Sequence, residues 1–203
     1  MHIVCSDLEG IFTPEIWINV AEKTGIDALK LTTRDEPDYD VLMQKRLAIL
    51  DENGLKLRDI TDVIETMNPL EGALDFLNWL REITQVIVVS DTYEEFAKPL
   101  MAKLGWPTLL CHRLTIGANG AIDTYNLRQR DSKYRAVVSL KELNYRVLSI
   151  GDSYNDISML KEAHYGFLFC PPDNVKKEYP QFPVSYKYSA LRQQMEPILR
   201  DGI

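Results

Sequence analysis

The chain has 203 residues, 45% hydrophobic and 26% charged, an ordinary composition for a globular protein. Its formal net charge of −7 and its lack of any Lys/Arg-rich run argue against a nucleic-acid-binding surface. No apolar stretch reaches membrane-spanning length, and the chain opens directly into an apolar strand, so we expect no membrane segment and no signal peptide. The length suits one domain with a modest insertion.

Cysteine and histidine usage points to a cytoplasmic protein without a zinc site. The cysteines are odd in number and each has an apolar context, which predicts reduced core thiols: Cys5, Cys111 and Cys170. The histidines are scattered and lack zinc-ligand spacing: His2, His112 and His164.

The first predicted element is a buried strand that begins at Ile3 and breaks off into Asp7, Glu9 and Gly10. Acids at the carboxyl end of such a strand lie where open α/β sheets bind ligands. Two adjacent carboxylates are costly to bury unless a cation such as Mg²⁺ lies between them. Taken alone, the segment fits two exposed loop acids equally well.

A long, charged, mostly helical region follows, with helices predicted over residues 14–23, 38–51 and 57–66. A βαβ crossover needs only one helix, so the surplus predicts an inserted helical cap. We place this cap at residues 14–68 and the catalytic core at 1–13 and 69–203. Residues 68–72 form the predicted return hinge.

Two more apolar runs end in polar groups and predict neighbouring strands of one parallel sheet. The first, residues 86–89, precedes Ser90, and the second, residues 147–150, precedes Asp152 and Asp156. Helices over residues 71–82, 93–104 and 133–143 alternate with the strands, and Lys133 starts the last. The segments 109–116 and 121–125, around Asn-Gly, predict a hairpin that sits on the core.

Four segments, in this order, resemble the haloacid dehalogenase superfamily of aspartate-nucleophile phosphotransferases. They are Asp-x-Glu at 7–9, Ser90, Lys133 and Gly-Asp-x-x-x-Asp at 151–156. Residues 104–106, 112–114 and 151–160 resemble the phosphoserine phosphatase branch. The resemblance extends from Ile3 to about Cys170. It implies a three-layer, Rossmann-like parallel sheet, a helical cap inserted after the first strand, and a homodimer.

The resemblance also implies a role for each acid and for the lysine. Asp7 is the nucleophile that forms an aspartyl-phosphate. Mg²⁺ is held by Asp7, Asp152 and the backbone carbonyl of Glu9, whose side chain serves as general acid and base. Lys133 and Ser90 bind the phosphoryl oxygens, and Asp156 orients Lys133.

Cap and core residues imply an amino-acid substrate. Arg46 falls where the branch binds a carboxylate, Met43 lies on the same helical face, and Glu15 matches an acid that meets an ammonium group. Asp91 and Asn155 complete the implied substrate contacts. The implied activity is hydrolysis of O-phosphoserine, with phosphoryl transfer to the alcohol homoserine, in amino-acid biosynthesis.

Two departures from the branch bear on specificity. Glu9 stands where Asp is usual, followed by Gly10 in place of Ser or Thr. Asp91 and Thr92 stand where the branch has glycines, which allow close backbone approach to a ligand.

Each residue also has a purely structural interpretation. Ser90 fits a helix N-cap, Lys133 a solvated helix residue, and Asp156 a favourable charge at a helix N-terminus. Arg46 fits an exposed position on a charged helix, and Met43 fits core packing. The alternative functions are a phosphatase of another small metabolite, a receiver-type phospho-accepting module, and a binding protein with a degenerate site.

Overall fold

A central β-sheet organises the structure, a computed structural model that describes residues 1–32, 35–36 and 38–201. The described strands follow the order β4-β3-β2-β1-β5-β6-β7. They are β1 (His2–Ser6), β2 (Gln85–Tyr93), β3 (Thr108–Ile116), β4 (Ile122–Asn126), β5 (Arg146–Gly151), β6 (Tyr165–Phe169) and β7 (Val184–Ser185). Neighbouring strands are parallel except β3 and β4. The predicted α/β class is therefore confirmed.

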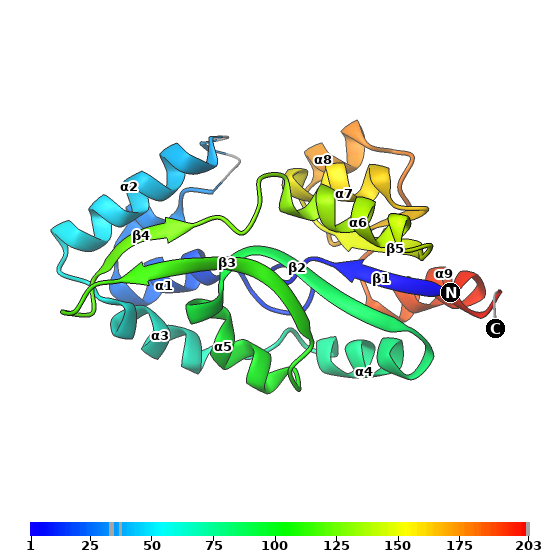
Figure 1. Cartoon of the computed structure of the whole chain (residues 1–203), viewed down its shortest axis with the longest axis horizontal. Coiled ribbons are helices and arrows are strands. Elements are labelled where there is room, and N and C mark those ends of the chain that lie inside the picture. Colours follow the sequence, from blue (N-terminus) through cyan, green and yellow to red (C-terminus); the bar gives the residue numbers. More distant parts are fainter. Residues whose placement is uncertain (33–34, 37, 202–203) are drawn as a thin grey trace.

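Helices cover both faces of this sheet and make three layers (Figure 1). One face carries α4 (Ala73–Ile83), α5 (Glu94–Lys103) and α9 (Tyr188–Arg200), and the other carries α6 (Ser132–Glu142) and α7 (Ile157–Glu162). A short helix, α8 (Asp173–Glu178), follows β6. Alternation along β1 explains the layering, because Val4 packs in the α4–α9 cluster whereas Ile3 and Cys5 pack with α6 and α7.

Between β1 and β2 lies a helical insertion composed of α1 (Ile16–Thr24), η1 (Asp27–Lys30), α2 (Tyr39–Glu52) and α3 (Leu57–Thr66). The first and second predicted helices begin one or two residues late, because Glu15 and Asp38 occupy N-cap positions. Asp38 accepts hydrogen bonds from the amides of Asp40 and Val41. The cap boundaries at 14 and 68 stay a prediction, and residues 33–34 and 37 within them lie outside the described chain.

The predicted hairpin forms between β3 and β4, but β3 also extends into the main sheet. The first half of β3 is a parallel strand of the main sheet, paired with β2 from Ile87↔Thr108 onward, and only its second half pairs with β4. The turn end contacts the helical insertion, where the Leu57 amide donates to the Gly120 carbonyl at 3.0 Å. The Asn-Gly pair predicts only the local turn. It carries no information about which strand pairs with the first half of β3.

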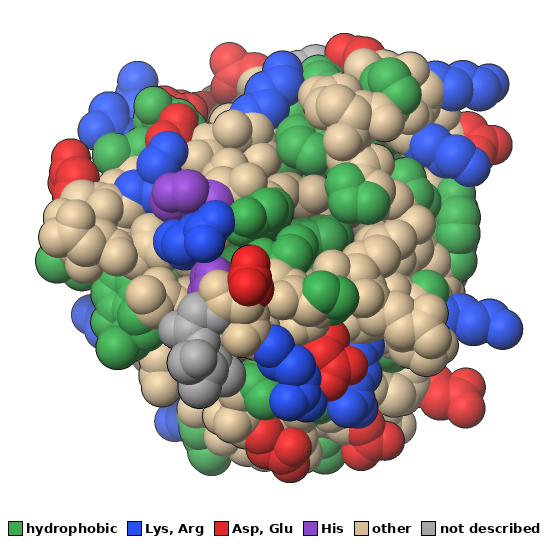
Figure 2. Space-filling model, turned by 90° about the vertical axis from the view of Figure 1, so that its right-hand side faces the viewer, with side chains coloured by type: hydrophobic (Ala, Val, Ile, Leu, Met, Phe, Trp, Pro, Cys, Tyr) green, Lys and Arg blue, Asp and Glu red, His purple; other side chains and the backbone are tan. Residues whose placement is uncertain are grey.

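The expectation that all three cysteines are core thiols is wrong for one of them. Cys5 and Cys111 are buried, but Cys170 is exposed and has a left-handed backbone with φ 47° after β6. All three thiols are free. On the face that carries both termini, acidic and basic side chains are interspersed (Figure 2). Within the described chain, every helix is too short or too polar to cross a bilayer.

Candidate active site

The carboxyl ends of β1, β2 and β5 meet at one edge of the sheet, as predicted. Ser6 of β1 pairs with Val88 of β2 and with Ile150 of β5, so the residues after these positions converge. A cavity of about 500 Å³ lies there, between the sheet and the helical insertion. Its walls include these predicted site residues: Asp7, Glu9, Glu15, Arg46, Ser90, Asp91, Lys133, Asp152 and Asn155.

Three buried carboxylates cluster at this edge of the sheet, and two of them, Asp7 and Asp152, line the cavity. Asp7, Asp152 and Asp156 each offer an oxygen within 4.8 Å of the others. Burial and the charge of Asp156 raise the pKa of Asp7 well above its usual range, although Lys133 opposes this. Hard oxygen donors that repel one another fit a divalent cation such as Mg²⁺. Asp7 and Asp152 are the side chains best suited to hold it, because Asp156 is engaged elsewhere.

Gly10 explains how Asp152 approaches the first strand. Its φ of +76° is left-handed, and an added Cβ would lie 2.7 Å from the Asp152 carboxyl carbon. The Ser or Thr usual at this position of the branch would collide with that carboxylate in this structure.

Lys133 links the nucleophile to Asp156. Its Nζ lies 3.0 Å from Asp7 Oδ1 and 2.6 Å from Asp156 Oδ1. The other oxygen of Asp156 accepts the amides of Asp152 and Ser153 at 2.9 and 3.1 Å. Burial would lower the pKa of Lys133, but the surrounding carboxylates outweigh it and hold the pKa well above its usual range. The solvated-lysine interpretation is therefore wrong, because this ammonium group is buried and charged.

Glu9 lies where its proton is retained. Its Oε2 accepts the Ile16 amide at the start of α1 at 2.8 Å. Burial, together with the nearby Glu15 carboxylate, raises the pKa of Glu9 to about 8. At neutral pH the side chain is therefore largely protonated in the metal-free protein, as a general acid requires.

Ser90, Asp91 and Thr92 occupy a bulge in β2. The pairing of β2 with β3 runs through Val89↔Leu110 and resumes at Tyr93↔His112, so four steps on β2 match two on β3. Ser90 is buried there, and its Oγ accepts the Thr92 amide at 3.2 Å. The N-cap of α5 is Tyr93, so the N-cap interpretation of Ser90 is wrong.

Arg46 is buried at the cavity wall. Its Nη2 donates to the Leu31 carbonyl at 2.7 Å, and its guanidinium lies 4.5 Å from the Trp17 ring centroid. Its Nε has no hydrogen-bond partner among the described residues. Met43 differs, because it packs in the hydrophobic cluster of the insertion and is not one of the cavity-lining residues. Its sulfur lies 3.7 Å from Arg46 Nη1.

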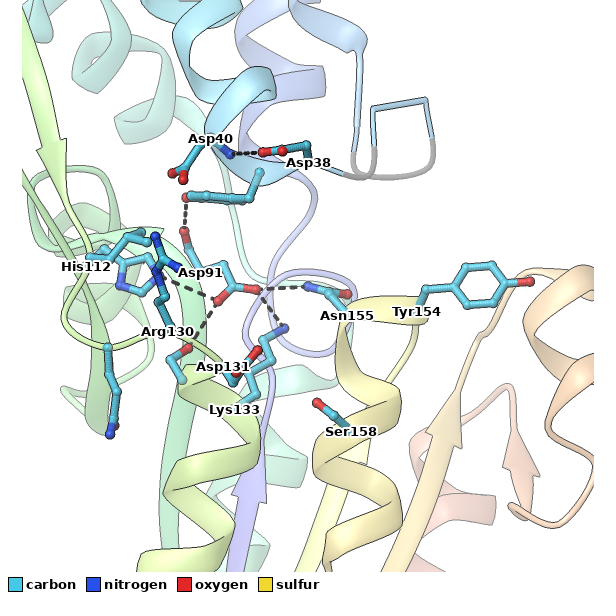
Figure 3. A pocket seen from close by; sticks show the side chains of 14 residues that line it. Asp38, Asp40, Asp91, His112, Arg130, Asp131, Lys133, Tyr154, Asn155 and Ser158 are labelled. Carbon is cyan, nitrogen blue, oxygen red and sulfur yellow. Dashed lines mark hydrogen bonds and ion pairs between the residues drawn. The ribbon is translucent and has the colours of Figure 1, made fainter.

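The sequence reasoning missed His112 and Tyr39. Both line a second cavity of about 650 Å³ (Figure 3), and Tyr39 also lines the first. The two cavities share Tyr39, Asp91, Lys133, Tyr154 and Asn155. The Tyr39 hydroxyl donates to the Asp91 carbonyl at 2.9 Å and lies 2.7 Å from the Tyr93 hydroxyl. His112 is buried on β3, and only the register of that strand brings it beside the bulge.

Comparisons with known proteins agree with this geometry. A family model described as haloacid dehalogenase-like hydrolase matches residues 3–164. The chain is 59% identical over 194 residues to phosphoserine phosphatase ThrH of Pseudomonas aeruginosa, covering 96% of this chain and 95% of that protein. It is 56% identical to a phosphoserine phosphatase of Pseudomonas syringae pv. tomato, covering 96% and 82%.

Solved structures support the fold. A phospho-aspartyl intermediate analogue of phosphoserine phosphatase superposes with a TM-score of 0.78 at 19% identity, covering 95% of this chain and 97% of that one. A substrate-bound phosphoserine phosphatase complex gives a TM-score of 0.78 at 18% identity, with the same coverage.

Proposed function

Because the chain belongs to the haloacid dehalogenase-like hydrolases, we propose that it is a Mg²⁺-dependent phosphoserine phosphatase that works through an aspartyl-phosphate on Asp7. The observation that carries the proposal is the buried Asp7 carboxylate, 3.0 Å from Lys133 and inside a three-carboxylate cluster. Two relatives above 50% identity carry the name phosphoserine phosphatase, which supports the choice of substrate.

In the first step a carboxylate oxygen of Asp7 attacks phosphorus, and the ester bond to the serine oxygen breaks. Protonated Glu9 donates its proton to the departing oxygen. Lys133 and Ser90 donate to the phosphoryl oxygens as their charge shifts. Held by Asp7, Asp152 and the Glu9 carbonyl, Mg²⁺ would supply positive charge to the same oxygens.

In the second step Glu9, now a carboxylate, removes a proton from the water that attacks the phosphorus of phospho-Asp7. The phosphorus–carboxylate bond breaks, and phosphate and free Asp7 result. Asp156 keeps Lys133 oriented throughout by its 2.6 Å contact.

The helical insertion supports an amino-acid substrate. Arg46 brings to the wall of the cavity a buried guanidinium whose Nε has no partner among the described residues, and Glu15 brings a carboxylate. A zwitterion presents the complementary carboxylate and ammonium groups. In this proposal the insertion is the cap that recognises phosphoserine, and Asn155 and Asp91 lie at its phosphate end.

The direct test compares wild-type protein with Asp7→Asn on a panel of phosphorylated metabolites, by phosphate release with and without Mg²⁺. We expect phosphoserine to be the best substrate and Asp7→Asn to be inactive but folded. Beryllofluoride with Mg²⁺ should form an adduct on Asp7. Turnover retained in Asp7→Asn would contradict the mechanism, and a better substrate in the panel would favour a phosphatase of another metabolite.

We further propose that phospho-Asp7 transfers its phosphoryl group to homoserine. Homoserine is serine with one more methylene, so its charged groups can meet Arg46 and Glu15 while its hydroxyl approaches phospho-Asp7. Titrating homoserine into a phosphoserine reaction should give phosphohomoserine beside phosphate in the ³¹P NMR spectrum. If only phosphate appears at every homoserine concentration, a simple phosphatase remains.

A further inference from the structure

Four side chains from three elements meet at the Asp91 carboxylate: helix α6, strand β3 and the short 3-10 helix η2 (Tyr154–Asp156) (Figure 3). Its Oδ1 accepts from Ser132 Oγ at 3.2 Å, and its Oδ2 accepts from Asn155 Nδ2 at 3.2 Å and lies 3.8 Å from Lys133 Nζ. The fourth neighbour is His112, whose Nε2 lies 3.6 Å from Oδ1. Two of these groups, Lys133 and Asn155, also line the catalytic cavity.

Hydrogen bonding distinguishes the two ring nitrogens of His112. Its Nδ1 accepts the backbone N–H of Arg128 at 3.1 Å. With Nδ1 as the acceptor, Nε2 is the ring nitrogen that carries a hydrogen. That nitrogen faces the Asp91 carboxylate at 3.6 Å, slightly beyond hydrogen-bonding distance. The ring is 3% exposed and packs 6.2 Å from the Tyr39 and Tyr93 ring centroids.

The His112 N–H matters because Asp91 competes with Asp7 and Asp156 for the ammonium group of Lys133. Burial would raise the pKa of Asp91, but Lys133, His112 and Asn155 together hold it below its usual range, so the carboxylate is charged. A carboxylate deprived of the His112 N–H would depend more heavily on its remaining donors. Those donors include the ammonium and amide groups that face the phosphoryl site.

We propose that His112 is a positioning residue that acts through Asp91, keeping Lys133 and Asn155 directed at the phosphoryl group. This inference rests on the proposed function for its substrate, but its basis is the geometry around Asp91. It also gives a role to Asp91, one of the residues at which the chain departs from the glycines of the phosphoserine phosphatase branch.

Two amide substitutions separate the two nitrogens of His112. Asparagine reproduces the position of Nδ1, so His112→Asn keeps an acceptor for Arg128 and loses the donor to Asp91. Glutamine reproduces the position of Nε2, so His112→Gln keeps the donor and loses the acceptor. His164→Asn is the matched control, because His164 Nδ1 likewise accepts a backbone N–H, from Val147 at 3.0 Å, away from both cavities.

We expect His112→Asn to lower kcat/KM for phosphoserine by about 10–100-fold, the range typical of lost outer-shell partners. His112→Gln should restore activity to within about threefold of wild type, and His164→Asn should match wild type. In an Asp91→Asn background, His112→Asn should have little further effect, because the two residues act as one unit. Equal losses in the Asn and Gln variants, or a larger loss in Gln, would overturn the proposal.

A binding measurement separates this inference from the proposed function. Calorimetric titration of the Mg²⁺-loaded protein with inorganic phosphate should show weaker binding in His112→Asn than in His112→Gln. If wild-type protein fails to hydrolyse phosphoserine, the proposed substrate is rejected. The difference in phosphate affinity between His112→Asn and His112→Gln can still be measured. Equal phosphate affinity in both variants would reject the role of His112, whatever the substrate.

Discussion

At the scale of single residues, Glu9 shows how placement sets chemistry. It is a carboxyl group beside a second carboxylate, Glu15, and it accepts a hydrogen bond from the Ile16 amide. The extra methylene relative to Asp carries its carboxyl group to the start of α1. There it keeps a proton that a solvated glutamate would lose.

We predict that removing the Glu15 charge lowers the pKa of Glu9 from about 8, because burial and then Glu15 raise it. Carboxyl ¹³C NMR of metal-free protein should show one glutamate titrating near that pH. The signal should be absent in Glu9→Gln and shifted to lower pH in Glu15→Gln. A glutamate signal unchanged by Glu15→Gln would show that the Glu15 charge does not act on Glu9.

The same shift has a consequence for stability. Between pH 4.5 and about 8 the unfolded chain has released this proton while the folded chain retains it. The free energy of unfolding should therefore fall as pH rises through this window. Chemical denaturation of metal-free protein should show a shallower fall for Glu9→Gln than for wild type.

At the scale of elements, the end of β5 depends on a glycine. A Cβ on Gly151 would lie 2.3 Å from the Cβ of Asp156, the residue that orients Lys133. We predict that Gly151→Ala lowers the free energy of unfolding by about 1–3 kcal/mol, as overpacking does, and also reduces kcat/KM.

Gly54→Ala is the control for Gly151→Ala. Gly54 has a φ of +65° but nothing within 4 Å of its missing Cβ, so the substitution strains the backbone far from the site. Thermal denaturation and steady-state kinetics should show lost stability in both variants and lost activity in Gly151→Ala alone. Normal kinetics in Gly151→Ala would mean that Asp156 tolerates displacement.

Helix α2 carries the predicted carboxylate clamp. Arg46→Ala should raise KM for phosphoserine, because losing one partner of a desolvated charge pair costs about 2–5 kcal/mol. Phosphoethanolamine, which lacks the carboxylate, should be a poor substrate and respond little to the change. Arg58→Ala, on the exposed side of α3, is the control. Equal losses on both compounds would indicate that Arg46 only packs against Trp17.

Strand ends could be predicted because an apolar run that stops at an acid is a local pattern. Asp7, Ser90, Asp152 and Lys133 therefore lie where the sequence led us to expect them. The bulge in β2 could not be predicted, because it is defined only against the register of β3. His112 was missed for the same reason, and Met43 was assigned to the substrate because helical spacing does not distinguish a cavity wall from a packed core.

At the scale of the whole molecule, the acidic cluster should make the stability of the fold depend on metal binding. A ligand that binds only the folded state at 100 times its Kd stabilises it by about 2.7 kcal/mol. For a chain of this size that corresponds to a Tm increase of about 5–10 °C. EDTA should abolish activity, Mg²⁺ should restore it and raise Tm, and Asp152→Asn should lose the Tm response. A metal-free protein that remains active would contradict the assignment.

The homodimer and the cytoplasmic location stay predictions at this scale. Sedimentation velocity over a range of protein concentrations would test the first.

Strand β3 gives the molecule a mechanical property. Its first half is bonded into the central sheet, and its second half joins β4 against the helical insertion, so one continuous strand crosses between the two parts (Figure 1). The insertion packs along this strand and β4, so opening the cavity widely would have to break that packing. We therefore expect the opening of the cavity to be small in amplitude. We expect such an opening to favour a free phosphorylated metabolite over a phosphorylated side chain on the surface of another folded protein.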